Sequence, residues 1–162
     1  MKKVGIVMGS DSDLPVIQKA VAVLRELDIP FEVHVYSAHR TPNEARDFAF
    51  YAREKGFGVL IAAAGMAAHL AGSIAANTTL PVIGIPCKGP ALEGLDALLS
   101  TVQMPSGIPV ATVGVNNGAN AALLAAEILA VEDASLAERL ADKRRRDTAS
   151  VLAKDAGIMA RL

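Results

Sequence analysis

The sequence has few aromatic residues and almost no cysteine. It contains no Trp, two Tyr and four Phe in 162 residues, so Ala and the branched aliphatic side chains must fill the core. The single cysteine, Cys87, cannot form an internal disulfide. A reducing, cytoplasmic compartment is therefore expected.

Other absences exclude several functional classes. The formal net charge is −1, so the basic surface of a nucleic-acid-binding domain is missing. No apolar run is long enough to span a membrane, and the N-terminus runs into a strand pattern without a signal-peptide cleavage site. The G-x-G-x-x-G fingerprint and the Gly-Lys-Ser/Thr ending of a P-loop are absent. His34, His39, His69 and Cys87 show no metal-ligand spacing, so no metal is expected. With both nucleotide motifs missing, no cofactor is expected either.

Apolar runs alternate with helical patterns along the chain. Strands are expected at residues 4–8, 31–36, 57–64, 80–86 and 110–115. Helices are expected at residues 14–24, 42–55, 67–77, 97–102 and 121–130. This alternation predicts a single three-layer α/β domain, residues 1–162, with a parallel sheet. Right-handed crossovers favour the flavodoxin-like, Rossmann-like strand order 2-1-3-4-5.

The C-terminal part of the chain adds a helix beyond this unit, at about residues 134–156. Its apolar stripe is partial and is interrupted by the run Arg144-Arg145-Arg146, which we interpret as a solvated or interface face. The helix could pack on its own core or on a neighbouring subunit. Helix 121–130 is almost wholly apolar and is expected to be buried all round. Loop 103–109, which holds two prolines, is expected to line a pocket or contact a subunit.

The stretch Ser37-Ala38-His39-Arg40-Thr41-Pro42 follows the second expected strand. Thr41 is expected as the N-cap and Pro42 as the first helical residue, so His39 and Arg40 lie in a strand-to-helix loop. Ligands bind at that edge of a parallel sheet. A proton-transfer group beside a guanidinium suits chemistry on an anionic substrate. The alternative is that Arg40 is a solvated charge and His39 an ordinary loop residue.

Other loops are expected at the same edge. The loop after the first strand offers hydroxyl and N–H groups for a phosphate, and Asp13 could accept hydrogen bonds from ribose hydroxyls. Alternatively, Ser12 and Asp13 only cap the next helix. His69 is expected to form a pocket wall or a hydrogen bond, or only to pack. The topology predicts one crevice that holds Ser10, Asp13, Ser37, His39, Arg40, Gly65, His69 and Lys88.

Five stretches carry a family resemblance: Met8 to Asp13, Ser37 to Pro42, Ala67 to Leu70, Pro81 to Gly84 and Gln103 to Pro109. Through them, about residues 3–130 resemble the N5-carboxyaminoimidazole ribonucleotide mutases of purine biosynthesis. The resemblance implies an isomerase that moves a carboxylate from the exocyclic amine of an aminoimidazole ribonucleotide to carbon 4 of its ring. It also implies that no ATP or metal is used, and that a homo-octamer forms active sites at subunit junctions.

The resemblance also implies residue roles. His39 would be the general acid/base. Ser10, Asp13 and Arg40 would bind the ribonucleotide, with Ser12 and Ser37 beside them. The migrating group would be released as CO2 and recaptured in a small, dry pocket. The wall of that pocket would include Gly65, His69, Leu70 and Lys88.

The chain departs from the family pattern at several positions. Met66 stands where many mutases have Gly, and Ala71 where they have Pro. The stretch Cys87 to Pro90 replaces a commoner serine-containing one. These departures affect the expected pocket wall and leave the fold and His39 unchanged.

Two alternative functions are weighed against the mutase. Related AIR carboxylases, which take CO2 directly, typically have Lys after the catalytic His and an Arg-Ser-Asn stretch in the third loop, whereas this chain has Arg40 and Ala67-Ala68-His69. A flavodoxin-like binding or signalling module is the non-catalytic alternative. FMN binding needs aromatic residues, and the proposed loops have only Tyr36 at their margin. A response regulator needs an aspartate where strand three ends in Ala64-Gly65.

Overall fold

The computed structural model describes residues 1–162 and contains one five-stranded sheet. The order is β2-β1-β3-β4-β5 and every neighbouring pair is parallel, so the predicted fold class and strand order are confirmed. The strands are β1 (Lys3–Met8), β2 (Phe31–Val35), β3 (Phe57–Gly65), β4 (Val82–Cys87) and β5 (Ala111–Thr112). The central strands are apolar and buried on both faces, as expected for a parallel sheet covered by helices.

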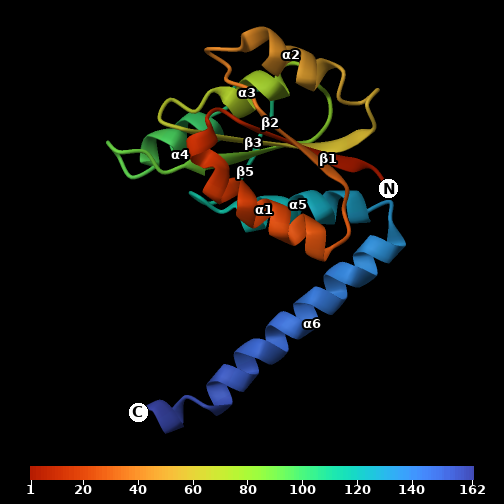
Figure 1. Ribbon diagram of the computed structural model, residues 1–162, viewed down its shortest axis with the longest axis vertical. Helices are drawn as coiled ribbons and strands as arrows, with labels where there is room; N and C mark the ends of the chain where they lie inside the picture. Colours follow the sequence, from red (N-terminus) through yellow and green to blue (C-terminus); the bar gives the residue numbers. More distant parts are fainter.

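Helices cover both faces of the sheet (Figure 1). The helices are α1 (Leu14–Glu26), α2 (Pro42–Phe50), α3 (Leu70–Ala75), α4 (Leu95–Val102), α5 (Gly118–Ala130) and α6 (Ala134–Ala156), with short 3-10 turns at Asp11–Asp13 and Met159–Arg161. One apolar core lies between the sheet and α1 with α5, and a second lies between the sheet and α2 with α3. The result is the three-layer arrangement that the alternating pattern predicts.

A close crossing of α1 and α5 fixes the position of the first loop. A β-carbon added at Gly118 would lie 2.1 Å from the carbonyl oxygen of Val16, so only glycine allows the two backbones to approach this far. Ala20, Ala121 and Ala122 are fully buried in the same core. The small side chains thus hold the start of α1 against α5, and α1 follows directly on the loop that contains Ser10 and Asp13.

Three predicted elements are shorter in the structure. Helix α2 ends at Phe50 rather than at residue 55, because Ala52 and Gly56 donate to carbonyls three residues back and tighten the chain into turns. Helix α3 begins at Leu70 rather than at residue 67, with His69 at its N-cap position. Strand β5 covers only Ala111–Thr112, since this edge segment pairs with β4 alone and then turns away.

Two expected N-cap residues occupy their predicted positions but make no side-chain capping bond. Thr41 occupies the N-cap position of α2, but its hydroxyl makes no bond to the helix. Asp13 occupies the N-cap position of α1 and likewise makes no side-chain capping bond. The hydroxyl of Ser12 donates to Ser10 Oγ at 2.9 Å instead. Because neither Ser12 nor Asp13 makes a side-chain capping bond to α1, capping does not account for their presence in this loop.

Helix α5 is not buried all round, contrary to the expectation from its composition. One face, which includes Ala121 and Ala125, is fully buried against the sheet and α1. Leu123, Leu124 and Leu129 are only partly buried. An apolar composition predicts burial, but in this single chain the sheet and α1 cover only one side of the helix.

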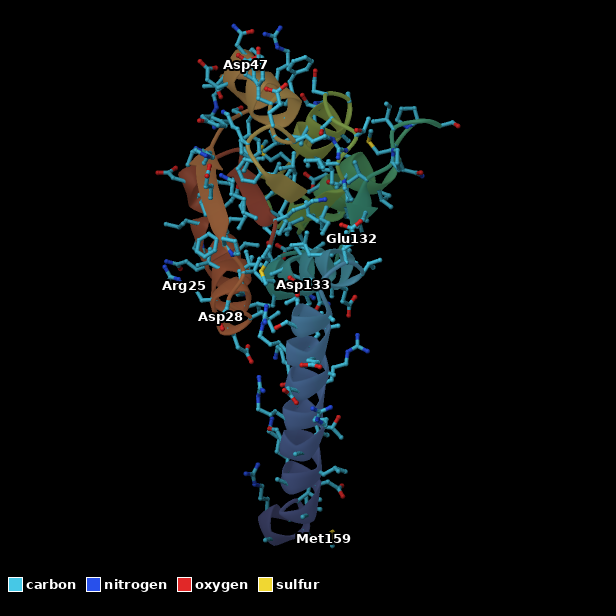
Figure 2. All side chains as sticks on the ribbon, turned by 90° about the vertical axis from the view of Figure 1, so that its right-hand side faces the viewer. Arg25, Asp28, Asp47, Glu132, Asp133 and Met159 are labelled. Atoms are coloured by element: carbon cyan, nitrogen blue, oxygen red, sulfur yellow. The ribbon has the colours of Figure 1, made fainter.

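Helix α6 leaves the body of the molecule, as Figures 1 and 2 show, and Figure 2 labels Met159 near its far end. Leu136 is buried, and Arg139 Nε donates to the carbonyl of Leu27 at 3.0 Å. Arg144 pairs with Glu127, so part of the arginine run forms a solvated ion-paired face. All residues from 144 onward are exposed. No helix of the structure is both long and apolar enough to cross a membrane.

Candidate active site

A cavity of about 530 Å³ lies at the carboxyl edge of the sheet. The loops that follow β1, β2, β3 and β4 form its walls, as expected for a ligand site in a parallel α/β fold. The structure brings together all ten residues that the sequence singles out: Ser10, Ser12, Asp13, Ser37, His39, Arg40, Gly65, His69, Leu70 and Lys88. Met66, Ala67, Gly89 and Pro90 also line the cavity, and all four belong to stretches expected to shape the pocket wall. The sequence analysis did not single out three further lining residues, Gly9, Ala38 and Ala64.

The loop after β2 is held by hydrogen bonds between its two ends. Ser37 N donates to Thr41 Oγ1 at 2.8 Å, and the Thr41 hydroxyl donates back to Ser37 O at 3.2 Å. The Ser37 hydroxyl oxygen accepts from the N–H groups of His39 and Arg40, at 3.3 and 3.2 Å. These contacts fix the backbone on which His39 and Arg40 stand. The Ser37 hydroxyl proton remains able to donate to a ligand.

Arg40 connects the second loop to the first. Its Nη2 atom donates to the carbonyl oxygen of Gly9 at 2.8 Å. A guanidinium carries five N–H donors, so this single contact leaves most of them available to an anion. Because Arg40 is exposed and lines the cavity, its charge lies where a phosphate could enter.

His39 and His69 form a hydrogen-bonded pair across the cavity. His39 Nε2 lies 2.9 Å from His69 Nδ1, and the two rings are nearly perpendicular, at 85°. In such a contact one ring nitrogen donates and the other accepts, so the contact holds one proton between the two residues. The prediction that His69 forms a hydrogen bond is confirmed. The residues are thirty positions apart in the chain, which is why the pairing has no local sequence signature.

Asp13 faces the buried thiol of Cys87. Burial raises the pKa of the Asp13 carboxyl, while hydrogen bonds from Cys87 and from the Ser10 backbone oppose that shift and the Asp11 charge adds to it. Burial and the neighbouring Asp13 charge raise the pKa of Cys87 to about 12. The thiol is therefore protonated at neutral pH and is not a nucleophile. Its Sγ donates to the Ile85 carbonyl oxygen at 3.7 Å.

The loops after β3 and β4 form the other side of the cavity. Met66 has φ of +56°, in the left-handed region that costs a non-glycine residue about 1–2 kcal/mol. The backbone N–H of Lys88 donates to Asn116 Oδ1 at 2.9 Å, and its ammonium group pairs with Glu93. The side chains of Ala64, Ala67 and Leu70 leave this wall small and apolar.

A second, more open hollow of about 670 Å³ lies on the other side of His69. Gln103 and Met104, from the start of the proline-containing loop, line it. This agrees with the expectation that the loop lines a pocket. His69 borders both spaces, while His39 and Arg40 border only the first.

The cavity combines three chemical functions. Arg40 and nearby hydroxyl groups can bind an anion, the Asp13 carboxyl can accept hydrogen bonds, and the histidine pair can move a proton. No group of three or more His, Cys, Asp or Glu side chains is arranged to hold a metal ion. The arrangement therefore fits acid–base chemistry on a small phosphorylated molecule.

Comparison with known proteins identifies the family. The family model of AIR carboxylase matches residues 3–150. The chain belongs to the AIR carboxylase family.

Two named relatives and one solved structure are similar over most of the chain. The N5-carboxyaminoimidazole ribonucleotide mutase of Pyrococcus horikoshii is 58% identical over 137 residues, which are 85% of this chain and 77% of that protein. The phosphoribosylaminoimidazole carboxylase of Saccharomyces cerevisiae is 52% identical over 151 residues, 93% of this chain but 26% of that longer protein. A variant of Treponema denticola PurE2 has a crystal structure that matches with a TM-score of 0.85, at 26% identity, and covers 96% of this chain and 98% of that one.

Membership of the AIR carboxylase family removes the non-catalytic alternatives. The cavity lining contains no Phe, Tyr or Trp on which a flavin ring could stack. Strand β3 ends at Gly65 after a run of alanines, without the aspartate that a response regulator needs. The remaining alternatives both act on aminoimidazole ribonucleotides.

Proposed function

We propose that the protein is an N5-carboxyaminoimidazole ribonucleotide mutase. It interconverts N5-carboxyaminoimidazole ribonucleotide and 4-carboxy-5-aminoimidazole ribonucleotide in purine biosynthesis. The observation that carries the proposal is the cavity itself, in which every residue that the resemblance assigns to substrate binding or proton transfer lies together. The similarity to the mutase of Pyrococcus horikoshii supports the same conclusion.

His39 is proposed to move the protons of the reaction. The carbamate nitrogen takes a proton from His39 as its bond to the carboxyl carbon breaks, which gives the free amine and CO2. Carbon 4 of the ring then forms a bond to CO2, and His39 removes the proton from carbon 4 so that the ring becomes aromatic again. One proton is donated and one is recovered, so the step is a balanced isomerisation. The contact with His69 Nδ1 orients the His39 ring and gives the proton a second site.

The ribonucleotide is proposed to bind through groups of the first two loops. Arg40 binds the phosphate together with hydroxyl groups of Ser10, Ser12 and Ser37. The Asp13 carboxyl accepts hydrogen bonds from the ribose hydroxyls. No cofactor or metal ion enters this mechanism.

Direct carboxylation is the second candidate function. The 52% identity with the Saccharomyces cerevisiae carboxylase favours it, because that match also covers 93% of this chain. In that reaction the uncarboxylated ribonucleotide and CO2 would bind in the same cavity, and His39 would remove the same proton. The two functions therefore differ in the substrate consumed and not in the residues used.

The purified protein is expected to convert the N-carboxylated ribonucleotide to the 4-carboxy product without ATP and in the presence of a metal chelator. A carboxyl group already attached to the substrate needs neither ATP activation nor a Lewis acid. Product formation is followed by ultraviolet absorbance, with a reaction lacking protein as the blank. Failure to form product above that blank, in protein shown to be folded, would contradict the proposed function.

We propose that the protein forms a stable homo-octamer, as the family resemblance implies, with α6 packing on a neighbouring subunit. Two features of the single chain support it. Leu95, Leu99 and Val102 form an exposed apolar stripe on α4, at 52%, 49% and 47% exposure. His39 and His69 are exposed although they line the proposed site, which a neighbouring subunit could cover. A cytoplasmic location is also proposed, supported by the free, buried Cys87.

Light scattering at micromolar protein concentration is expected to give the mass of an octamer. The apolar α4 stripe and the projecting part of α6 would otherwise face water. The measurement is repeated at high salt, because contacts based on apolar area persist when charges are screened. A monomer under both conditions would contradict both the assembly and the shared-site proposal.

A further inference from the structure

Two residues with long side chains are held in strained backbone conformations, and both lie in loops beside the cavity. Four non-glycine residues have positive φ, and two of them, Asp28 and Asn116, are of types that tolerate it. The other two are Met66, at +56°, and Glu93, at +55°. Such strain persists only where the surrounding structure imposes it, and it occurs most often at functional sites.

The strain at Glu93 accompanies an ion pair that stabilises the loop after β4. Its carboxylate pairs with Lys88, whose backbone N–H is bound to Asn116. Gly89 and Pro90, between the paired residues, line the cavity. This loop therefore forms one fixed side of the opening.

Met66 extends from the opposite side toward that loop. A β-carbon added at Gly89 would lie 3.5 Å from Met66 Cγ and 3.7 Å from Met66 N, so the two loops meet here without a side chain between them. Met66 lines the cavity, yet 61% of its surface is exposed. The Met66 backbone thus adopts a conformation that suits glycine better, and it holds an apolar side chain at the opening.

We propose that Met66 is the water-excluding cover of the cavity, which retains the CO2 released during carboxyl transfer. This inference rests on the proposed function. CO2 has no charge and no strong hydrogen-bonding group, so Arg40 and the serines cannot hold it. Met66 lines the cavity together with Ala64, Ala67 and Leu70. An apolar side chain at the opening slows both the escape of CO2 and the entry of water that would hydrate it to bicarbonate. This role explains the strained backbone at Met66, because the left-handed conformation places the methionine side chain at the opening.

The test compares the wild-type protein with Met66→Gly and Met66→Leu. Each protein is given unlabelled N-carboxylated ribonucleotide in carbon-13 bicarbonate, with carbonic anhydrase present to equilibrate the dissolved CO2. The label in the 4-carboxy product is measured by mass spectrometry at low conversion. Wild type and Met66→Leu are expected to incorporate little label, and Met66→Gly is expected to incorporate several-fold more. Because glycine suits a φ of +56°, Met66→Gly is also expected to unfold at or above the wild-type temperature.

Three results would overturn the inference. Equal, low labelling of the product by wild type and Met66→Gly would show that Met66 does not retain CO2. Full labelling of the product by the wild type would show that the protein does not retain CO2 at all. A change in assembly mass without a change in labelling would make Met66 a subunit contact instead. If the wild type forms no product from the carbamate, both the proposed function and the inference are contradicted. The three results above contradict only the inference.

Discussion

Replacing His39 with asparagine is expected to lower turnover by about 10²–10⁴-fold, the usual contribution of a general acid–base group. Asparagine is too short to keep the contact that His39 Nε2 makes with His69, and it cannot take up or release the proton that the reaction moves. The side chain is exposed, so folding should be unaffected. Ribonucleotide binding is expected to stay close to that of the wild type, because Arg40 and the loop hydroxyls are unchanged.

His34→Asn is the matched control for this variant. His34 lies on edge strand β2, stacks on Tyr36 with ring centroids 5.0 Å apart, and does not line the cavity. Its replacement should leave turnover unchanged. Turnover is measured with saturating N-carboxylated ribonucleotide, and binding by calorimetry with the product. Near-normal turnover of His39→Asn would remove His39 from the proton-transfer role.

Replacing Arg40 with alanine is expected to weaken ribonucleotide binding by about 10–100-fold, the range for one or two hydrogen bonds to a charged group. The effect should exceed that of Asp13→Asn, because the arginine contact to phosphate is charge-assisted and has the geometry for two parallel hydrogen bonds. The lost bond to the Gly9 carbonyl also loosens the first loop.

Arg46→Ala is the matched control for Arg40→Ala. Arg46 stands on α2, outside the cavity, and pairs with Asp47 at 2.9 Å on the surface. Calorimetric titration with the product ribonucleotide compares the three variants, and high salt should reduce the wild-type affinity more than that of Arg40→Ala. An unchanged affinity of Arg40→Ala would mean that the phosphate binds elsewhere in the cavity.

The sheet and the position of the cavity could be predicted because they depend on local patterns. The buried strands β1, β3 and β4 appear as continuous apolar runs, and the connections between parallel strands are right-handed, so the strand order follows. The carboxyl ends of those strands then fall on one edge. The candidate site residues could be predicted because most of them lie in the loops directly after these strands.

Features that depend on contacts between distant residues could not be predicted. Thr41 and Asp13 take the expected N-cap positions, but their side chains make no capping bond, and the Thr41 hydroxyl is bonded to Ser37 instead. The pairing of His39 with His69 depends on the direction of two side chains from different loops. Burial of α5 was overestimated because composition does not show which neighbours are present in a single chain.

The most direct test of the central claim is a comparison of substrates. Initial rates are measured with the N-carboxylated ribonucleotide at low bicarbonate, and separately with the uncarboxylated ribonucleotide and CO2, at equal ribonucleotide concentrations. The mutase assignment predicts efficient conversion of the first and only weak conversion of the second. Efficient consumption of the uncarboxylated ribonucleotide with CO2, without consumption of the carbamate, would contradict it and make the protein a direct carboxylase.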